Sequence, residues 1–228
     1  MTTWLNNAWY VAGWDAEIDT TPFPRTVCGV PMVFYRKLDR SVVAMRDACP
    51  HRLLPLSVGI REGDSLRCKY HGLKLGPDGV AEEMPLISDP VNRSICAETY
   101  VTHERYRFVW VWIGDKDMAD PALIPPFWRG ALGKDGPVDR WQVCRFLLPA
   151  SVMIDVGVAP VGAGASLADH DQGVRGMVVD FMTPETEGTH HYFWGMARNF
   201  NIDDPGFTAR FKAAQGGVFA EDKVVLEA

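Results

Sequence analysis

Hydrophobic and polar residues alternate along several short segments of the chain, and this alternation predicts β-strands. The clearest case is Arg105–Trp112, in which Tyr106, Phe108, Trp110 and Trp112 occupy every second position. Two further strands are predicted at Val27–Tyr35 and Ser41–Met45. Because turn residues such as Pro77-Asp78-Gly79 recur between such runs, residues 1–115 are predicted to form a small all-β barrel or sandwich.

The second half of the chain combines further strands with one long helix. Strands are predicted at Val138–Phe146, Val152–Val158, Gly176–Met182 and His190–Met196. The helix is predicted to begin at Asp203-Asp204-Pro205, because Asp caps helices and Pro suits their first turn, and to continue through Leu226. The expected fold class is therefore α+β. We expect an all-β domain over residues 1–120, followed over residues 121–228 by an antiparallel sheet packed on a long helix.

The net charge of the chain is −6 at pH 7, with 23 Lys and Arg residues against 29 Asp and Glu. Nucleic acids and anionic membranes select clustered basic residues, so we expect neither as a partner. No segment approaches the roughly 20 consecutive apolar residues that cross a membrane. The N-terminal residues lack the basic start and apolar stretch of a signal peptide, so a cytoplasmic protein is expected.

The cysteines point to metal binding. The chain has five of them, and an odd number suits a disulfide framework poorly. Cys49-Pro50-His51 is followed, after sixteen residues, by Cys68-Lys69-Tyr70-His71. Each of the two segments thus offers one thiolate and one imidazole. In a Rieske [2Fe–2S] centre two cysteines bind one iron and two histidines bind the other, which raises the reduction potential above that of an all-cysteine cluster.

A structural zinc site is the main alternative, because two cysteines and two histidines also bind zinc tetrahedrally. Zinc fingers normally pair Cys with Cys and His with His along the sequence, whereas each segment here is mixed. Residues around the motifs, Ser57 among them, are expected to donate hydrogen bonds to cluster sulfurs. The pattern therefore favours an iron–sulfur cluster bound by Cys49, His51, Cys68 and His71.

At these motifs the chain resembles the Rieske non-haem iron oxygenases, and among them the oxygenase components of vanillate O-demethylase and dicamba monooxygenase. Segments similar to the first domain of that family are Asn7–Ala12, Phe108–Asp115 and Ala119–Ile124. Segments similar to the second domain are Pro126–Arg129, Val138–Trp141, Val179–Pro184, Tyr192–Phe200 and Glu221–Asp222. The resemblance covers nearly the whole chain and implies a helix-grip fold for the second domain.

One central part of the family pattern has no counterpart. Such oxygenases activate O2 at a mononuclear iron held by two histidines and a carboxylate, and the family carries the histidines as Asp-x-x-His-x-x-x-x-His on a helix. None of the six histidines of this chain has that spacing. In this chain, the family's first-domain motif at Leu123-Ile124 is followed almost directly by its second-domain motif at Pro126-Phe127, without the several dozen residues expected between them. The chain also ends inside the expected C-terminal helix.

Two explanations remain open. Either the sequence omits a segment of a longer protein, or the chain is a deletion variant without a catalytic iron. The first is favoured, because removing a helix from the middle of a domain would open its core, at several kcal/mol for each large side chain exposed.

By resemblance, Asp222 is the carboxylate ligand of the mononuclear iron. Its neighbours three and four positions away are apolar, so its carboxylate is expected to project into an apolar stripe, where it needs a metal or an ionic partner. Those neighbours are Val218, Phe219, Val225 and Leu226. An ion pair with Lys or Arg is the alternative. Asp180, in an otherwise apolar strand, is a candidate to hydrogen-bond a substrate, and an ordinary paired aspartate is an equal alternative.

The resemblance implies O2-dependent demethylation of a methoxylated aromatic acid such as vanillate, which releases formaldehyde. It also implies a homotrimer, and electrons from NADH through a separate reductase or ferredoxin; the chain has no Gly-x-Gly-x-x-Gly motif of its own. Two alternatives stay open: a Rieske oxygenase that hydroxylates another aromatic substrate, and a Rieske electron carrier without oxygen chemistry. The absence of a pocket near Asp222 would favour the carrier.

Overall fold

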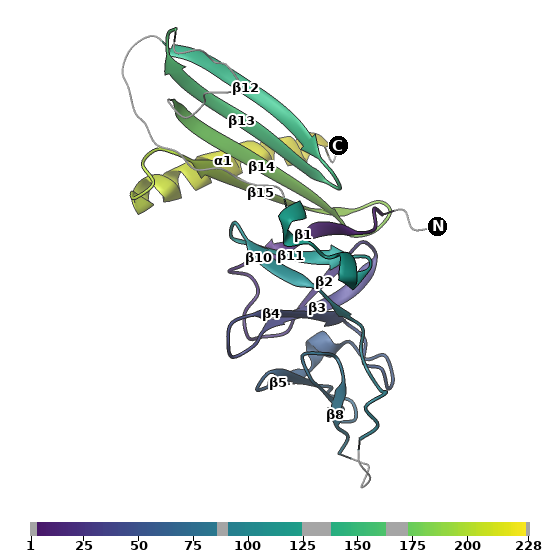
Figure 1. The fold of residues 1–228 in the computed structure, drawn as a ribbon. Coiled ribbons are helices and arrows are strands. Elements are labelled where there is room, and N and C mark those ends of the chain that lie inside the picture. The colour runs from purple at the N-terminus through teal and green to yellow at the C-terminus, as the bar shows by residue number, and fades with distance from the viewer. Residues whose placement is uncertain (1–3, 86–90, 125–137, 163–172, 227–228) are drawn as a thin grey trace. The chain divides into compact units, whose positions relative to one another are not determined.

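The computed structural model describes residues 4–85, 91–124, 138–162 and 173–226 (Figure 1). It divides into two compact units. Unit 1 comprises Met1–Pro126, Phe146–Val152 and Val179–Trp194, and unit 2 comprises Phe127–Arg145, Met153–Val178 and Gly195–Ala228. Each unit is thus made of three separate segments of the chain. The predicted division into two domains at a single boundary near residue 120 stays a prediction.

Unit 1 is built on three small sheets, with neighbouring strands in the orders β1-β11-β10, β2-β3-β4-β9 and β5-β6-β7-β8. The first sheet contains β1 (Ala8–Trp14), β10 (Thr102–Arg105) and β11 (Phe108–Ile113). The second contains β2 (Phe23–Val27), β3 (Val30–Arg36), β4 (Val42–Arg46) and β9 (Thr99–Tyr100). The third contains β5 (Ile60–Glu62), β6 (Ser65–Arg67), β7 (Lys74–Leu75) and β8 (Ala81–Glu83). The predicted all-β N-terminal region is confirmed.

Two predicted strands are in fact hairpins. Val27–Tyr35 is interrupted after β2 by Cys28 and Gly29, whose φ angles are 51° and 73°. The predicted strand at Arg105–Trp112 is interrupted by Tyr106 and Arg107, with φ angles of 60° and 68°. Two-residue hairpins need left-handed backbone at both central positions, which matches the twist of the flanking strands.

The Tyr106–Arg107 turn is held by Asp15, whose partners could not be read from the sequence. The backbone N–H of Asp15 donates to the Arg107 carbonyl over 2.9 Å, and its carboxylate lies 3.0 Å from the Arg107 guanidinium. A left-handed residue other than glycine costs about 1–2 kcal/mol, so such tertiary contacts are what stabilise this turn.

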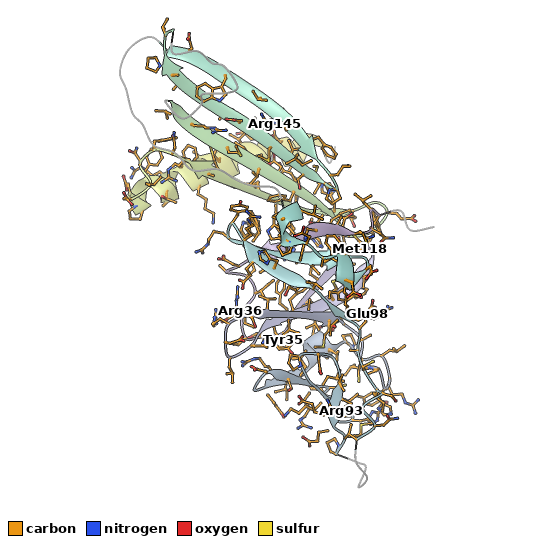
Figure 2. The ribbon with its side chains drawn as sticks, viewed as in Figure 1. Tyr35, Arg36, Arg93, Glu98, Met118 and Arg145 are labelled. Atoms are coloured by element: carbon orange, nitrogen blue, oxygen red, sulfur yellow. The ribbon has the colours of Figure 1, made fainter. Side chains whose placement is uncertain are left out.

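Two hydrophobic cores lie on either side of the second sheet, since successive side chains of β3 point to opposite faces. Met32 and Phe34 belong to one core, and Val33 and Tyr35 to the other. The Tyr35 hydroxyl also donates to the Asp64 carbonyl over 2.8 Å, which ties β3 to the third sheet. Figure 2 shows Tyr35 beside Arg36 on this strand.

The buried Arg36 guanidinium joins several loops on the other face of β3. It donates to the carbonyls of Asp15, Ile18 and Arg40 and forms an ion pair with Glu104. A buried charge is tolerated when it is paired and hydrogen-bonded in this way.

The C-terminal part of the chain holds an antiparallel sheet in chain order, β12-β13-β14-β15, and one long helix (Figure 1). The strands are β12 (Val138–Leu147), β13 (Ser151–Pro160), β14 (Val174–Pro184) and β15 (His190–Arg198), and the helix is α1 (Pro205–Leu226). The predicted sheet and helix are confirmed, and so is the α+β fold class. The two glycines at 216 and 217 do not interrupt the helix.

Helix α1 begins where the sequence predicts. The Asp204 carboxylate accepts a 2.9 Å hydrogen bond from the backbone N–H of Phe207, which satisfies one of the free donors of the first turn. Phe200, just after β15, packs its ring against those of Phe207 and Phe211. The first turns of the helix are thereby fixed to the end of β15.

We predict that Leu66→Ala lowers the free energy of unfolding of unit 1 by about 2–5 kcal/mol, because the substitution leaves a cavity in a closed core. Leu66 is completely buried, together with the neighbouring Leu56, Leu73 and Leu75. Chemical denaturation measures the change. As a matched control, Leu38→Ala removes the same atoms from a side chain that is 72% exposed and should change the free energy by less than about 0.5 kcal/mol.

Candidate iron–sulfur site

The first cysteine–histidine motif folds into a tight loop after β4. The backbone N–H of Cys49 donates to the Leu54 carbonyl, and the Cys49 carbonyl accepts from the N–H of Leu53, both over 2.8 Å. Leu53 has a left-handed backbone with φ of 58°. His51 lies within this loop, between Cys49 and Leu53, and the His51 side chain is exposed.

The second motif, after β6, repeats the same pattern. The N–H of Cys68 donates to the Leu73 carbonyl over 2.9 Å, and its carbonyl accepts from the N–H of Gly72 over 3.0 Å. Gly72, with φ of 76°, stands at the position of Leu53 in the first loop. The two loops are therefore equivalent supports, each anchored at both backbone groups of its cysteine.

The four predicted ligands come together as two like pairs. Cys49 and Cys68 are each only 2% exposed and lie in the same hydrophobic core. Burial raises the pKa of the Cys49 thiol, and its hydrogen bond with Cys68 raises that pKa further. The rings of His51 and His71 meet edge to face, with centroids 4.7 Å apart.

This arrangement fits a binuclear cluster. In a Rieske centre the two thiolates share one iron and the two imidazoles share the other, which matches one buried cysteine pair and one histidine pair nearer the surface. The Nδ1 atom of His71 is buried without a hydrogen-bond partner. An iron bound at this nitrogen would supply the missing partner. The identity of the four ligands stays a prediction.

One expectation about the surroundings is wrong. Ser57 does not face the cysteines: its hydroxyl donates to the Asp47 carboxylate over 2.6 Å, and its backbone N–H donates to the same group over 2.7 Å. An ionised carboxylate is a stronger acceptor than a sulfur atom, so Ser57 braces the first loop instead. Sequence reasoning did not single out Asp47, because its partner lies ten residues away.

The structure assembles no second metal site around Asp222. Asp222 is exposed, and the expected buried stripe fails at Val218, which is 51% exposed. Within the described residues, no group of three or more His, Cys, Asp and Glu side chains is arranged to hold one metal ion.

The remaining histidines have other positions. His103 lies beside the Trp9 ring, His190 is exposed, and His191 bonds to the Thr26 carbonyl over 2.8 Å. His170 and the Pro125–Pro126 junction lie outside the described residues. The residues described here therefore do not fit a mononuclear iron.

Asp180 is buried and paired. It is 7% exposed and accepts a 2.8 Å hydrogen bond from the Tyr192 hydroxyl. Burial raises the pKa of Asp180, and this hydrogen bond lowers it in part. A cavity of about 400 Å³ lies in unit 1, lined by residues of β2 and β3 together with Asp47, Glu185 and His191. Neither Asp180 nor Asp222 lines it.

Comparisons with known proteins agree with both halves of this description. Residues 8–100 match the family model of the Rieske [2Fe-2S] domain, and residues 106–228 match that of the vanillate O-demethylase oxygenase C-terminal domain. The vanillate O-demethylase oxygenase subunit of Pseudomonas sp. (strain HR199 / DSM 7063) is 35% identical over 301 residues, covering 97% of this chain and 84% of that protein. Because this chain has only 228 residues, that relative contains segments without a counterpart here.

Solved structures show the same fold. Apo dicamba monooxygenase superposes with a TM-score of 0.86 at 30% sequence identity, over 98% of this chain and 86% of that one. Dicamba monooxygenase with non-heme iron and dicamba superposes with a TM-score of 0.80 at 29% identity, over 89% and 80% of the two chains.

The chain thus has a Rieske domain followed by a C-terminal domain. The family model of the C-terminal domain matches more than half of the chain. The chain belongs to the family of Rieske oxygenases that includes the vanillate O-demethylase oxygenase subunits.

Proposed function

We propose that this chain is the oxygenase component of an aromatic O-demethylase and that Cys49, His51, Cys68 and His71 bind its [2Fe–2S] cluster. The cluster assignment is supported by the convergence of two equivalent loops on a buried cysteine pair and a histidine pair. The O-demethylase activity is supported by the similarity to the vanillate O-demethylase oxygenase subunit and to dicamba monooxygenase. When bound, the cluster accepts and passes on single electrons.

The residues around the loops suit electron entry from a partner. The cysteines are enclosed by core side chains, while His51 is exposed. Tyr70 covers the His71 ring at a centroid distance of 3.8 Å and is itself 61% exposed. A donor protein that touches this surface would come close to the cluster without opening the core.

The substrate is proposed to be a methoxylated aromatic acid such as vanillate, with formaldehyde and a phenol as products. NADH would supply electrons through a separate reductase or ferredoxin, and the chain would assemble as a homotrimer in the cytoplasm. The five cysteines are all free, which suits a reducing compartment. No helix in the described part of the chain has the length and apolar character needed to span a membrane.

A mononuclear Fe(II) would require residues beyond those described here. We propose Asp222 as its carboxylate ligand in a complete protein, and Asp180 as a substrate contact. The described residues bring no two histidines together with Asp222 in a group that could hold this iron.

A second function follows from the described residues, which bring together no group of three or more His, Cys, Asp and Glu side chains that could hold a mononuclear iron. A chain without that iron would act as an electron carrier that transfers electrons without activating O2 itself.

We predict that Cys68→Ser abolishes the visible absorption and the electron paramagnetic resonance signal of the cluster, since the variant lacks one thiolate of the iron-binding pair. Acid-labile sulfide should fall to background. Cys96→Ser is the matched control: Cys96 is an exposed free cysteine on the same unit, and its loss should leave cluster content unchanged. A cluster of full intensity in Cys68→Ser would refute the ligand assignment.

Product analysis separates the two functions. With vanillate, O2, NADH and a compatible reductase, an O-demethylase should release one formaldehyde for each phenol formed. The carrier alternative predicts reduction of the cluster, no formaldehyde, and only the two irons of the cluster bound per chain. A cis-diol product would instead identify a ring-hydroxylating oxygenase.

We predict that Asp180→Asn raises the KM for the aromatic substrate several-fold if Asp180 contacts it. Tyr192→Phe is the control, because it removes the observed partner of Asp180 and leaves the carboxylate in place. Equal KM values for wild type and Asp180→Asn would assign Asp180 a structural role only. Steady-state kinetics with a saturating electron donor provides the measurement.

A further inference from the structure

Arg67 is the last residue of β6 and directly precedes Cys68. Its guanidinium forms a forked pair with Glu62: Nε lies 2.7 Å from Oε1 and Nη2 lies 2.8 Å from Oε2. Nη2 also lies 2.8 Å from Oε2 of Glu83. The side chain is 21% exposed, so this group is largely enclosed by its partners.

A further contact reaches the second cluster loop itself. Nη1 of Arg67 donates to the carbonyl of Gly72 over 2.8 Å. Gly72 directly follows His71, and its left-handed backbone leaves no room for a side chain, since a Cβ atom there would lie 2.9 Å from Pro85. The carbonyl that Arg67 holds belongs to the Gly72–Leu73 peptide, one residue beyond His71, in the loop whose Leu73 carbonyl accepts from the Cys68 N–H.

These contacts connect one ligand loop to two strands. Glu62 ends β5 and Glu83 ends β8, the two edges of the third sheet. The planar guanidinium presents five donors in a fixed geometry, which lets one side chain bind two carboxylates and a carbonyl at once. A lysine ammonium is a point charge and cannot reproduce the fork.

We propose that Arg67 is a positioning residue for the iron–sulfur cluster: it fixes the His71 loop through the Gly72 carbonyl and offsets the charges of Glu62 and Glu83 beside the cluster. This proposal rests on the ligand assignment made above, and it is independent of the substrate.

An ordinary surface ion pair on the same unit provides the comparison. Arg46 lies 3.8 Å from Glu98, and both side chains are 55% exposed. Exposed pairs of this kind contribute little to stability. Arg46→Gln removes the same charge as Arg67→Gln without touching a ligand loop.

The test measures three properties of purified protein that carries its cluster: the midpoint potential, the g values of the reduced cluster, and the rate of iron release to a chelator. Arg67→Gln should lower the potential, because two carboxylates lose their counter-charge near the cluster and an added electron becomes less favourable. It should also shift the g values and release iron several-fold faster than Arg46→Gln. Arg67→Lys should restore the potential in part, but neither the g values nor the release rate.

Glu62→Gln tests the direction of the change in midpoint potential. Because this variant keeps Arg67, it also serves if Arg67→Gln does not fold. It should raise the potential, opposite to Arg67→Gln, and still speed iron release, because one half of the fork is lost. General unfolding would not move the potential in opposite directions. If Arg67→Gln matches Arg46→Gln in all three properties, or if Glu62→Gln leaves the potential and iron release unchanged, the proposal is wrong. Wild-type protein without any cluster would instead refute the ligand assignment.

Discussion

The burial of two thiols at the base of two equivalent loops is the constraint on which the rest of the site depends. Each cysteine uses both of its backbone groups to close its loop, and both side chains enter a core of leucines between the second and third sheets. With the cysteines fixed there, the histidines are left at the outer edge, where their rings meet. In the proposed assignment, the cysteine end of the cluster is enclosed by the core and the histidine end lies nearer the surface.

The supports of these loops come from charged residues that lie just before each motif in the sequence. Asp47 holds the first loop through Ser57, and Arg67 holds the second through Gly72. A cluster exchanges electrons efficiently when its ligands do not reorganise, and a network of charge-assisted hydrogen bonds restrains them more strongly than packing alone. The third sheet therefore acts as a frame for the ligand loops, and its Leu66, Leu75 and Ala81 belong to the core that encloses the two cysteines.

The two parts of the chain differ in how many of their expected metal ligands the structure brings together. Unit 1 brings together the four residues proposed as ligands of the Rieske cluster, as one buried cysteine pair and one histidine pair. The described part of the C-terminal region has the sheet and helix of its family, yet Asp222 stands exposed and without histidine partners. The vanillate O-demethylase relative carries additional residues within the aligned region, which have no counterpart in this chain. The geometry of the two loops supports binding of an electron-accepting cluster, whereas the oxygenase activity is supported by the similarity to known oxygenases.

The sequence by itself determined the strand-rich first half, the helix start at Asp204 and the cluster motif, because each depends on residues close together along the chain. Local periodicity and capping do not need distant partners. Only the tertiary structure decided the Tyr106–Arg107 hairpin, which Asp15 stabilises, the capture of Ser57 by Asp47, and the fork of Arg67. It also decided the exposure of Asp222, since an apolar pattern along a helix does not state whether anything packs on it. These features depend on groups that folding brings together, and no pattern of neighbouring residues encodes them.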